Sequence, residues 1–151
     1  MKQTVRVAVM AILISLALAA TALADDRGEA VSRVQKAIAL AKGGGVEKTL
    51  EVLNDSSSEL GSGANYVFAY DMDGTMLANV VKKELIGKNI LDVPDAQGKM
   101  FRREIVEQMK TKDQVWMDYV TVNPKTKANE QKSSYCEKYQ DVVFCCGFYK
   151  K

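Results

Sequence analysis

The sequence predicts an α+β fold in which helices are kept apart from one five-stranded antiparallel sheet. Over residues 25–54 apolar residues recur at helical spacing, whereas segments after residue 65 alternate with a period of two. The strand-like segments follow one another through turn residues, with one helical crossing between the second and the third. This order favours helices packed on an antiparallel sheet over the alternating units of a parallel one.

The first 24 residues have the pattern of a secretory signal peptide. Lys2 and Arg6 precede an almost unbroken apolar run from Val7 to Ala20, and small residues suit cleavage after Ala24. The run is shorter than the roughly 20 residues of a spanning helix. We expect a periplasmic or secreted protein with no membrane span after cleavage, and one domain over residues 25–151. The alternative is that the signal is kept as an anchor.

Charge and composition exclude several functions. The chain has 21 Lys+Arg, 19 Asp+Glu and no histidine, and loss of Lys2 and Arg6 would leave 19 of each sign. Nucleic-acid binding needs a clustered positive surface, so we expect no nucleic-acid partner. The absence of histidine excludes Ser-His-Asp and Cys-His catalysis and His-ligated metals. We expect no cofactor and no metal site.

Three cysteines make an odd count for an exported chain. Cys136 could form a cross-strand disulfide with Cys145 or with Cys146, which would leave one thiol free. The plainer interpretation, which we favour from the sequence, is three small buried residues on neighbouring strands. The spacing fits neither a zinc knuckle nor a Cys-x-x-Cys redox pair.

Three helices are predicted. An amphipathic helix begins near Asp25 or Asp26, where acidic side chains suit a helix N-terminus, and the glycines at 43–45 end it. A second, shorter helix ends near Asn54. A third helix is predicted from about Lys99 to Lys110, with apolar residues on one face.

Five strands are predicted from period-two alternation and turn residues. The first begins at Tyr66, and Asp73-Gly74 is a hairpin turn that returns the chain through Thr75–Asn79. The last three strands form a meander. Their expected ranges are 114–122, 131–138 and 141–149.

The segment Asp71–Thr75 also matches the nucleophile motif of haloacid-dehalogenase-like phosphatases. In a Mg-dependent enzyme of that kind Asp71 would be the nucleophile and Asp73 the general acid. That fold needs a parallel doubly wound sheet, and too few residues follow Thr75 to build one. A turn between strands is the simpler interpretation, because Asp and Gly tolerate its backbone angles.

With this turn read as a hairpin, the chain from Asp25 to Lys150 resembles the single Cache domains of type 2, in particular the stand-alone exported members. Cache domains are PAS-like extracytoplasmic sensors of chemoreceptors and sensor kinases. Each motif alone is modest, but their order and spacing are specific. The segments that carry the resemblance are 66–79, 85–92, 95–99, 116–119, Asn123-Pro124, 132–135 and 146–149.

The resemblance implies a five-stranded PAS-like sheet with N-terminal helices on one face and a helical crossing segment over a pocket on the other. It also implies a ligand carboxylate held by Lys132. The ligand-binding residues we expect are Lys132, Tyr119, Trp116, Tyr70, Asn79, Thr121, Ser134 and Tyr135. The family often has His at the position of Asn79 and Trp at that of Thr121, so the ligand here can differ from the usual one.

We therefore expect a sensor, not an enzyme, that binds a short organic acid of the acetate, propionate or pyruvate type. The resemblance implies a signalling partner, either a membrane receptor or a sensor kinase, as in chemotaxis. Two alternatives stay open at this point: the phosphatase that uses Asp71, and a docking or adaptor domain without a ligand.

Overall fold

The computed structural model describes residues 25–150, so the expected signal peptide and its cleavage site lie outside the described residues. Residues 25–44 are helical. Helix α2 spans Val46–Asn54, the 3₁₀ helix η1 spans Lys83–Leu85, and α3 spans Phe101–Met109. Among the described residues, no helix combines the length and the hydrophobicity needed to cross a membrane.

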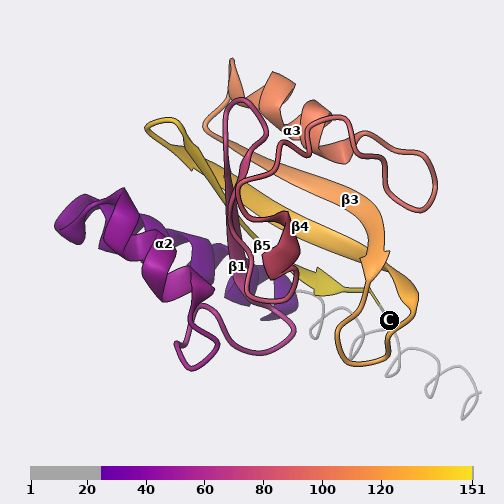
Figure 1. Ribbon diagram of the computed structural model, residues 1–151, viewed down its shortest axis with the longest axis horizontal. Coiled ribbons are helices and arrows are strands. Elements are labelled where there is room, and N and C mark those ends of the chain that lie inside the picture. Colours follow the sequence, from indigo (N-terminus) through magenta and orange to yellow (C-terminus); the bar gives the residue numbers. More distant parts are fainter. Residues whose placement is uncertain (1–24, 151) are drawn as a thin grey trace, which may run out of the picture.

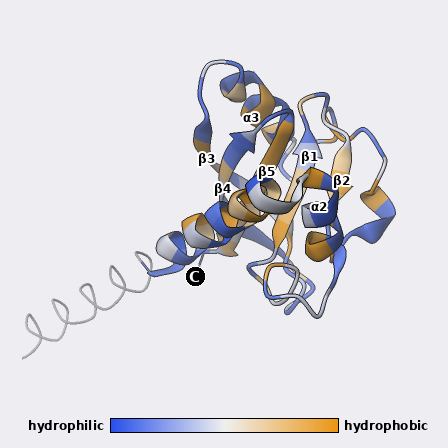
Figure 2. Ribbon diagram, turned by 90° about the vertical axis from the view of Figure 1, so that its left-hand side faces the viewer, coloured by the Kyte–Doolittle hydropathy of each residue, from blue (hydrophilic) through white to orange (hydrophobic). Residues whose placement is uncertain are grey.

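The predicted breaks between helices are confirmed. Gly45 separates the first helix from α2 with a φ of 91°, a left-handed conformation that glycine adopts without a steric penalty. Leu53 is fully buried on α2, and Phe101, Ile105 and Met109 form the buried side of α3. In Figure 2 hydrophobic and hydrophilic residues alternate along the helical turns, as expected for helices with one buried face.

The five predicted strands form one sheet. They are β1 (Val67–Asp71), β2 (Met76–Ala78), β3 (Gln114–Val122), β4 (Asn129–Tyr139) and β5 (Val142–Tyr149). The strand order is β2-β1-β5-β4-β3, and every neighbouring pair is antiparallel. Strand β4 starts two residues earlier than predicted, because its pairing with β3 continues to Asn129 opposite Val122.

The sheet has a separate hydrophobic cluster on each face. One cluster joins the helix of residues 25–44 and α2 to residues such as Phe144 and Phe148 of β5. The other joins α3 to residues such as Tyr70 and Tyr119 on the opposite face. Figure 1 shows α3 on one side of the sheet, away from the indigo N-terminal helix and α2. The α+β prediction is therefore confirmed.

Asp71 is the last residue of β1, directly before the turn to β2. Its Oδ1 accepts hydrogen bonds from the backbone N–H groups of Asp73 (3.0 Å) and Thr75 (2.8 Å). Both neighbours of β1 are antiparallel to it. The doubly wound parallel sheet that the phosphatase alternative needs is therefore not present, and the carboxylate of Asp71 stabilises a turn.

A disulfide joins Cys136 of β4 to Cys145 of β5, which are direct partners in the antiparallel register with Cα atoms 4.1 Å apart. Our preference for three unpaired cysteines was wrong for this pair. The period-two alternation places both side chains on the α3 face. Cys146 points to the opposite face as a buried free thiol, and its Sγ lies 2.9 Å from the carbonyl oxygen of Asn65.

Candidate functional site

A small, partly open hollow, here called the inner chamber, lies between the sheet and the start of α3. Its volume is about 20 Å³, which leaves room for about one water molecule. The residues that line the inner chamber are Tyr66, Phe68, Met76, Asn79, Lys82, Phe101, Arg102, Tyr119, Thr121 and Lys132. They come from four strands or strand ends, one loop and the start of α3.

Lys132 reaches the chamber from the middle of the sheet. In the register its neighbours are Tyr119 on β3 and Tyr149 on β5. Paired residues on adjacent strands share a face, so two tyrosines flank the lysine. The Nζ lies 4.7 Å from the ring centre of Tyr66, 5.6 Å from that of Phe68 and 5.0 Å from that of Tyr149. These distances allow cation–π attraction from three rings.

The charge of Lys132 has no anionic partner within residues 25–150. The residue is 1% exposed, and no carboxylate in that part of the chain lies within ion-pair distance of its Nζ. Burial, together with the nearby charge of Lys82, lowers the pKa of Lys132 to about 8. The lysine is still mostly protonated at pH 7. The chamber thus presents a buried positive charge.

Gly147 makes room for Lys132. Gly147 on β5 is the direct partner of Ser134 on β4. A Cβ at position 147 would overlap the Ser134 side chain and come 2.9 Å from Lys132 Cε. The Ser134 hydroxyl in turn lies 2.9 Å from the Tyr119 hydroxyl, and the two share a hydrogen bond. The absence of a side chain at Gly147 therefore leaves the space on β5 that the side chains of Lys132 and Ser134 occupy.

A second cation enters from the loop after β2. The Asn79 Oδ1 accepts hydrogen bonds from the backbone N–H groups of Val81 (3.1 Å) and Lys82 (2.8 Å), which fixes the start of this loop. The Lys82 Nζ donates a hydrogen bond to Thr121 Oγ1 at 3.1 Å. Burial, and then the charge of Arg102, lowers the pKa of Lys82. Asn79 and Thr121 thus position a lysine at the chamber wall.

A third cation, Arg102, comes from the first turn of α3. Its guanidinium lies 4.3 Å from the ring centre of Phe101, and its Nη1 donates a hydrogen bond to the Val93 carbonyl (3.1 Å). Phe101 in turn stacks on Tyr119, with ring centres 3.9 Å apart and an interplanar angle of 2°. Burial lowers the pKa of Arg102. Three cations from three different elements therefore line the chamber, and among the described residues no acid does.

A larger hollow, here called the outer cleft, adjoins the inner chamber. Its volume is about 300 Å³, and it shares Lys82, Phe101, Arg102 and Thr121 with the chamber. Leu85, Val93, Pro94 and Val122 add apolar walls, and Glu84 and Asp95 are its acidic residues. The two oxygens of Asp95 accept hydrogen bonds from the backbone N–H groups of residues 97, 99 and 120. Asp95 is therefore engaged in fixing the loop to β3.

Four of the eight residues expected at the site line the chamber: Lys132, Tyr119, Asn79 and Thr121. Ser134 lies behind Tyr119. Tyr70 is fully buried beneath α3, with its hydroxyl 3.7 Å from Cys145 Sγ, and does not line the chamber.

Trp116 and Tyr135 lie on the opposite face of the sheet. They pack against each other in the cluster under the N-terminal helix, where the guanidinium of Arg27 lies 4.1 Å from the Trp116 ring centre. Successive side chains of a strand point to opposite faces of the sheet. Trp116 is three positions from Tyr119 on β3, and Tyr135 is three positions from Lys132 on β4, so the two residues of each pair face opposite sides. We therefore leave both out of the proposed site.

Sequence reasoning missed six lining residues. Tyr66 and Phe68 could have been found, because they alternate with the same period as Tyr70. Phe101 belongs to the apolar face of the third predicted helix, which by itself indicates only core packing, and Met76 lies next to a register shift between β1 and β2. No sequence motif or periodicity marks Lys82 or Arg102 as a site residue, since only the tertiary structure brings this loop and this helix together.

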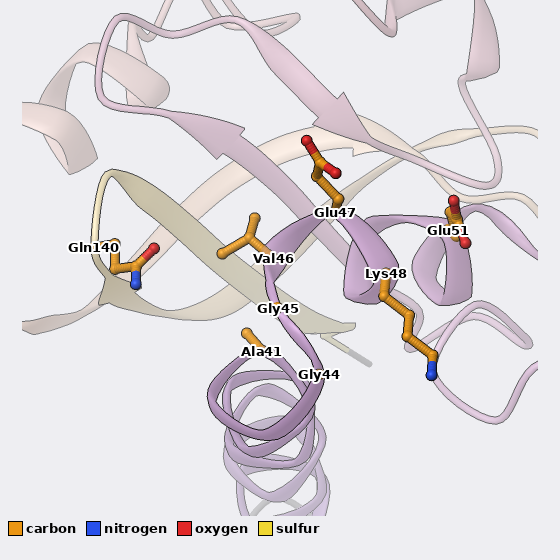
Figure 3. Close-up of a pocket in the computed structure, with 8 residues that line it drawn as sticks. All are labelled: Ala41, Gly44, Gly45, Val46, Glu47, Lys48, Glu51 and Gln140. Carbon is orange, nitrogen blue, oxygen red and sulfur yellow. The ribbon is translucent and has the colours of Figure 1, made fainter.

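Another groove, of about 530 Å³, lies where the N-terminal helix, α2 and the β4–β5 turn meet. Figure 3 shows Gln140 across the gap from Val46, while Glu47 and Lys48 point away from each other. Polar groups that converge on one point are what a small-molecule site needs, and this groove lacks them. Among residues 25–150 no group of three or more His, Cys, Asp or Glu could hold a metal ion.

A five-stranded antiparallel sheet in the order β2-β1-β5-β4-β3, with the N-terminal helices on one face and α3 on the other, is consistent with a Cache or PAS-like fold. Residues 10–151 match the family Single Cache domain 2, and the chain therefore belongs to this family of extracytoplasmic sensor domains, which are not enzymes. A search of curated proteins gave no match.

Solved structures share the fold. A methyl-accepting chemotaxis protein from Vibrio parahaemolyticus has 22% sequence identity and a TM-score of 0.72, over 89% of this chain and 95% of that one. A periplasmic sensor domain of a chemotaxis protein has 21% identity and a TM-score of 0.64, over 93% and 98%. A Cache chemosensory domain, described for its carboxylic acid recognition, has 18% identity and a TM-score of 0.71, over 87% and 97%.

Proposed function

We propose that this domain binds a short carboxylic acid reversibly, without chemistry, and passes the signal to a membrane receptor or a sensor kinase. The observation that carries the proposal is the buried ammonium of Lys132, which has no carboxylate partner within residues 25–150. A ligand carboxylate would supply the missing countercharge. Buried charges are costly unless they are paired.

The polar groups around Lys132 suit a planar anion. Lys82 and Arg102 add positive charge from two other sides, and the Tyr119 hydroxyl offers a hydrogen bond. A charge-assisted hydrogen bond contributes roughly 1.5–3 kcal/mol net. The carboxylic acid recognition described for one structural neighbour of the same fold supports this class of ligand.

The size of such a ligand limits its affinity. At a ceiling of about 1.5 kcal/mol per heavy atom, an acid of four to six heavy atoms gains at most roughly 6–9 kcal/mol. That range corresponds to dissociation constants from tens of micromolar to below micromolar. The site therefore suits a sensor of plentiful metabolites such as acetate, propionate or pyruvate.

Calorimetry on unfolded and refolded protein, freed of copurified ligand, tests the proposal with these three acids. We expect at least one to bind, and Lys132→Met to abolish the binding. Lys125→Met is the matched control, because Lys125 is exposed on the turn before β4. If no acid binds, or if Lys132→Met binds as well as the control, the proposal fails. Binding to another protein without any small-molecule thermal shift would favour an adaptor domain.

A further inference from the structure

The inner chamber is too small to hold a whole organic acid. Its volume of about 20 Å³ matches about one water molecule, so one carboxylate beside Lys132 would fill it. The remainder of any ligand must extend past Lys82 and Arg102 into the outer cleft of about 300 Å³, because these residues line both hollows. The route from one hollow to the other thus passes between two further cations.

Neither of these two cations is paired with an acid within residues 25–150. The contacts of Lys82 Nζ there include the Thr121 hydroxyl, and those of Arg102 include the Val93 carbonyl and the Phe101 ring, all of which are neutral. By contrast, Arg103, the next residue on α3, forms an ion pair with Asp92. Burial lowers the pKa of both Lys82 and Arg102, and the charge of Arg102 also lowers the pKa of Lys82, whereas the charge of Glu84 raises the pKa of Lys82 and that of Asp95 raises the pKa of Arg102.

The charges of the whole site favour a ligand with more than one negative group. Three cations face the connected hollows, and a single carboxylate would neutralise one of them. In the outer cleft, Asp95 is held by three backbone N–H groups, and Glu84 is exposed. The apolar walls of Leu85, Val93 and Pro94 suit the carbon chain between two charged ends.

We propose that the ligand is a small dianion, with one carboxylate on Lys132 in the inner chamber and a second anionic group held between Lys82 and Arg102 at the opening to the outer cleft. This inference rests on the proposed function and narrows its ligand class from carboxylic acids to dicarboxylic acids. Lys132 would bind one carboxylate of any acid, whereas Lys82 and Arg102 would favour acids with two negative charges over acids with one.

Succinate and its monomethyl ester are a matched pair of probes, because they have the same carbon chain and differ by one negative charge at pH 7. Calorimetry on the unfolded and refolded protein compares their dissociation constants. We expect succinate to bind at least tenfold more tightly than the ester. The ratio of the two constants should fall to about one in both Lys82→Met and Arg102→Met.

Lys83→Met is the control, because this lysine is adjacent in sequence but exposed and does not line the inner chamber. It should keep the wild-type ratio. A thermal unfolding curve for each variant checks that it is folded. Equal affinities for succinate and the ester in the wild type would overturn the dianion inference and leave the proposed function standing, provided that one acid binds.

A preference for succinate that persists in both Lys82→Met and Arg102→Met would also overturn the inference, since the second anion would then be held elsewhere. If neither succinate nor the ester binds, and acetate, propionate and pyruvate do not bind either, the proposed function fails together with the inference.

Discussion

Lys132 is placed at a cost to folding. Its side chain is buried at 1% exposure, and burial holds its pKa at about 8, below the usual value of 10.5. The three aromatic rings around the Nζ offset only part of the desolvation of the charge. Such a residue is expected where a ligand, and not stability, requires the charge.

Lys132→Met should therefore stabilise the protein in the absence of added acid. Methionine keeps a flexible stem of similar size and removes the buried charge. A depression of the pKa to about 8 corresponds to an increase in unfolding free energy of about 1–3 kcal/mol at pH 7. Urea unfolding measures this change. Lys125→Met, on the surface, should change it by less than about 0.5 kcal/mol. A Lys132→Met protein less stable than the wild type would contradict this account.

The affinity for a carboxylate should fall above pH 8. The acid binds the protonated lysine, and the pKa of Lys132 without ligand is about 8. Between pH 6 and 7.5 both partners are charged and the affinity should be constant. As the pH rises through 8 the lysine loses its proton, so the affinity should weaken by up to about tenfold per pH unit. Calorimetry from pH 6 to 9.5 measures this dependence, and a constant affinity up to pH 9.5 would show that Lys132 does not carry the binding.

At the scale of elements, β5 supports the site through Gly147. A methyl group at this position would overlap the Ser134 side chain and press on Lys132 Cε. Gly147→Ala should destabilise the fold by about 1–3 kcal/mol, as overpacking of a closely packed core does, and should weaken acid binding at least tenfold. Urea unfolding and calorimetry measure the two effects. Gly28→Ala, where a Cβ would meet nothing within 4 Å, is the control. Unchanged acid binding in Gly147→Ala would show that the close approach is not needed.

The elements were predictable because each has a local pattern. The first helix ends at Gly44, with the break at Gly45 inside the predicted run of glycines, and Asp73-Gly74 lies in the turn from β1 to β2 as expected. The assignment of site residues to a face was less accurate. The family resemblance grouped Trp116 with Tyr119, although three positions along a strand place two residues on opposite faces. Counting positions from Lys132 would have corrected this.

The remainder of the site could not be predicted from local patterns. Lys82 lies on a loop fixed by Asn79, and Arg102 lies on a helix that packs across β3. Both read as ordinary surface cations in the sequence, and only the tertiary fold turns them toward Lys132. The disulfide likewise depends on the exact register of β4 and β5, which the spacing of the cysteines left open.

At the scale of the whole molecule, the ligand site lies on one face of the sheet and the N-terminal helix covers the other. An acid in the proposed position would contact Lys132 of β4, Lys82 of the loop and Arg102 of α3 at once. Bound ligand would thus connect the sheet to the segment over it. Residues 25–44 would make no contact with the ligand, and any effect on them would be transmitted through the sheet.

Hydrogen exchange should report this difference. Ligand at a hundred times its dissociation constant stabilises the binding-competent state by about 2.7 kcal/mol. Amides of residues 79–109 that exchange through openings of this segment away from the sheet should be slowed up to about a hundredfold by the acid. In residues 25–44 the exchange should slow less, because opening of that helix leaves the chamber intact. Lys132→Met with the same acid is the control and should show no slowing. Protection confined to β4 and β5, with residues 79–109 unchanged, would mean that the segment over the chamber takes no part in holding the ligand.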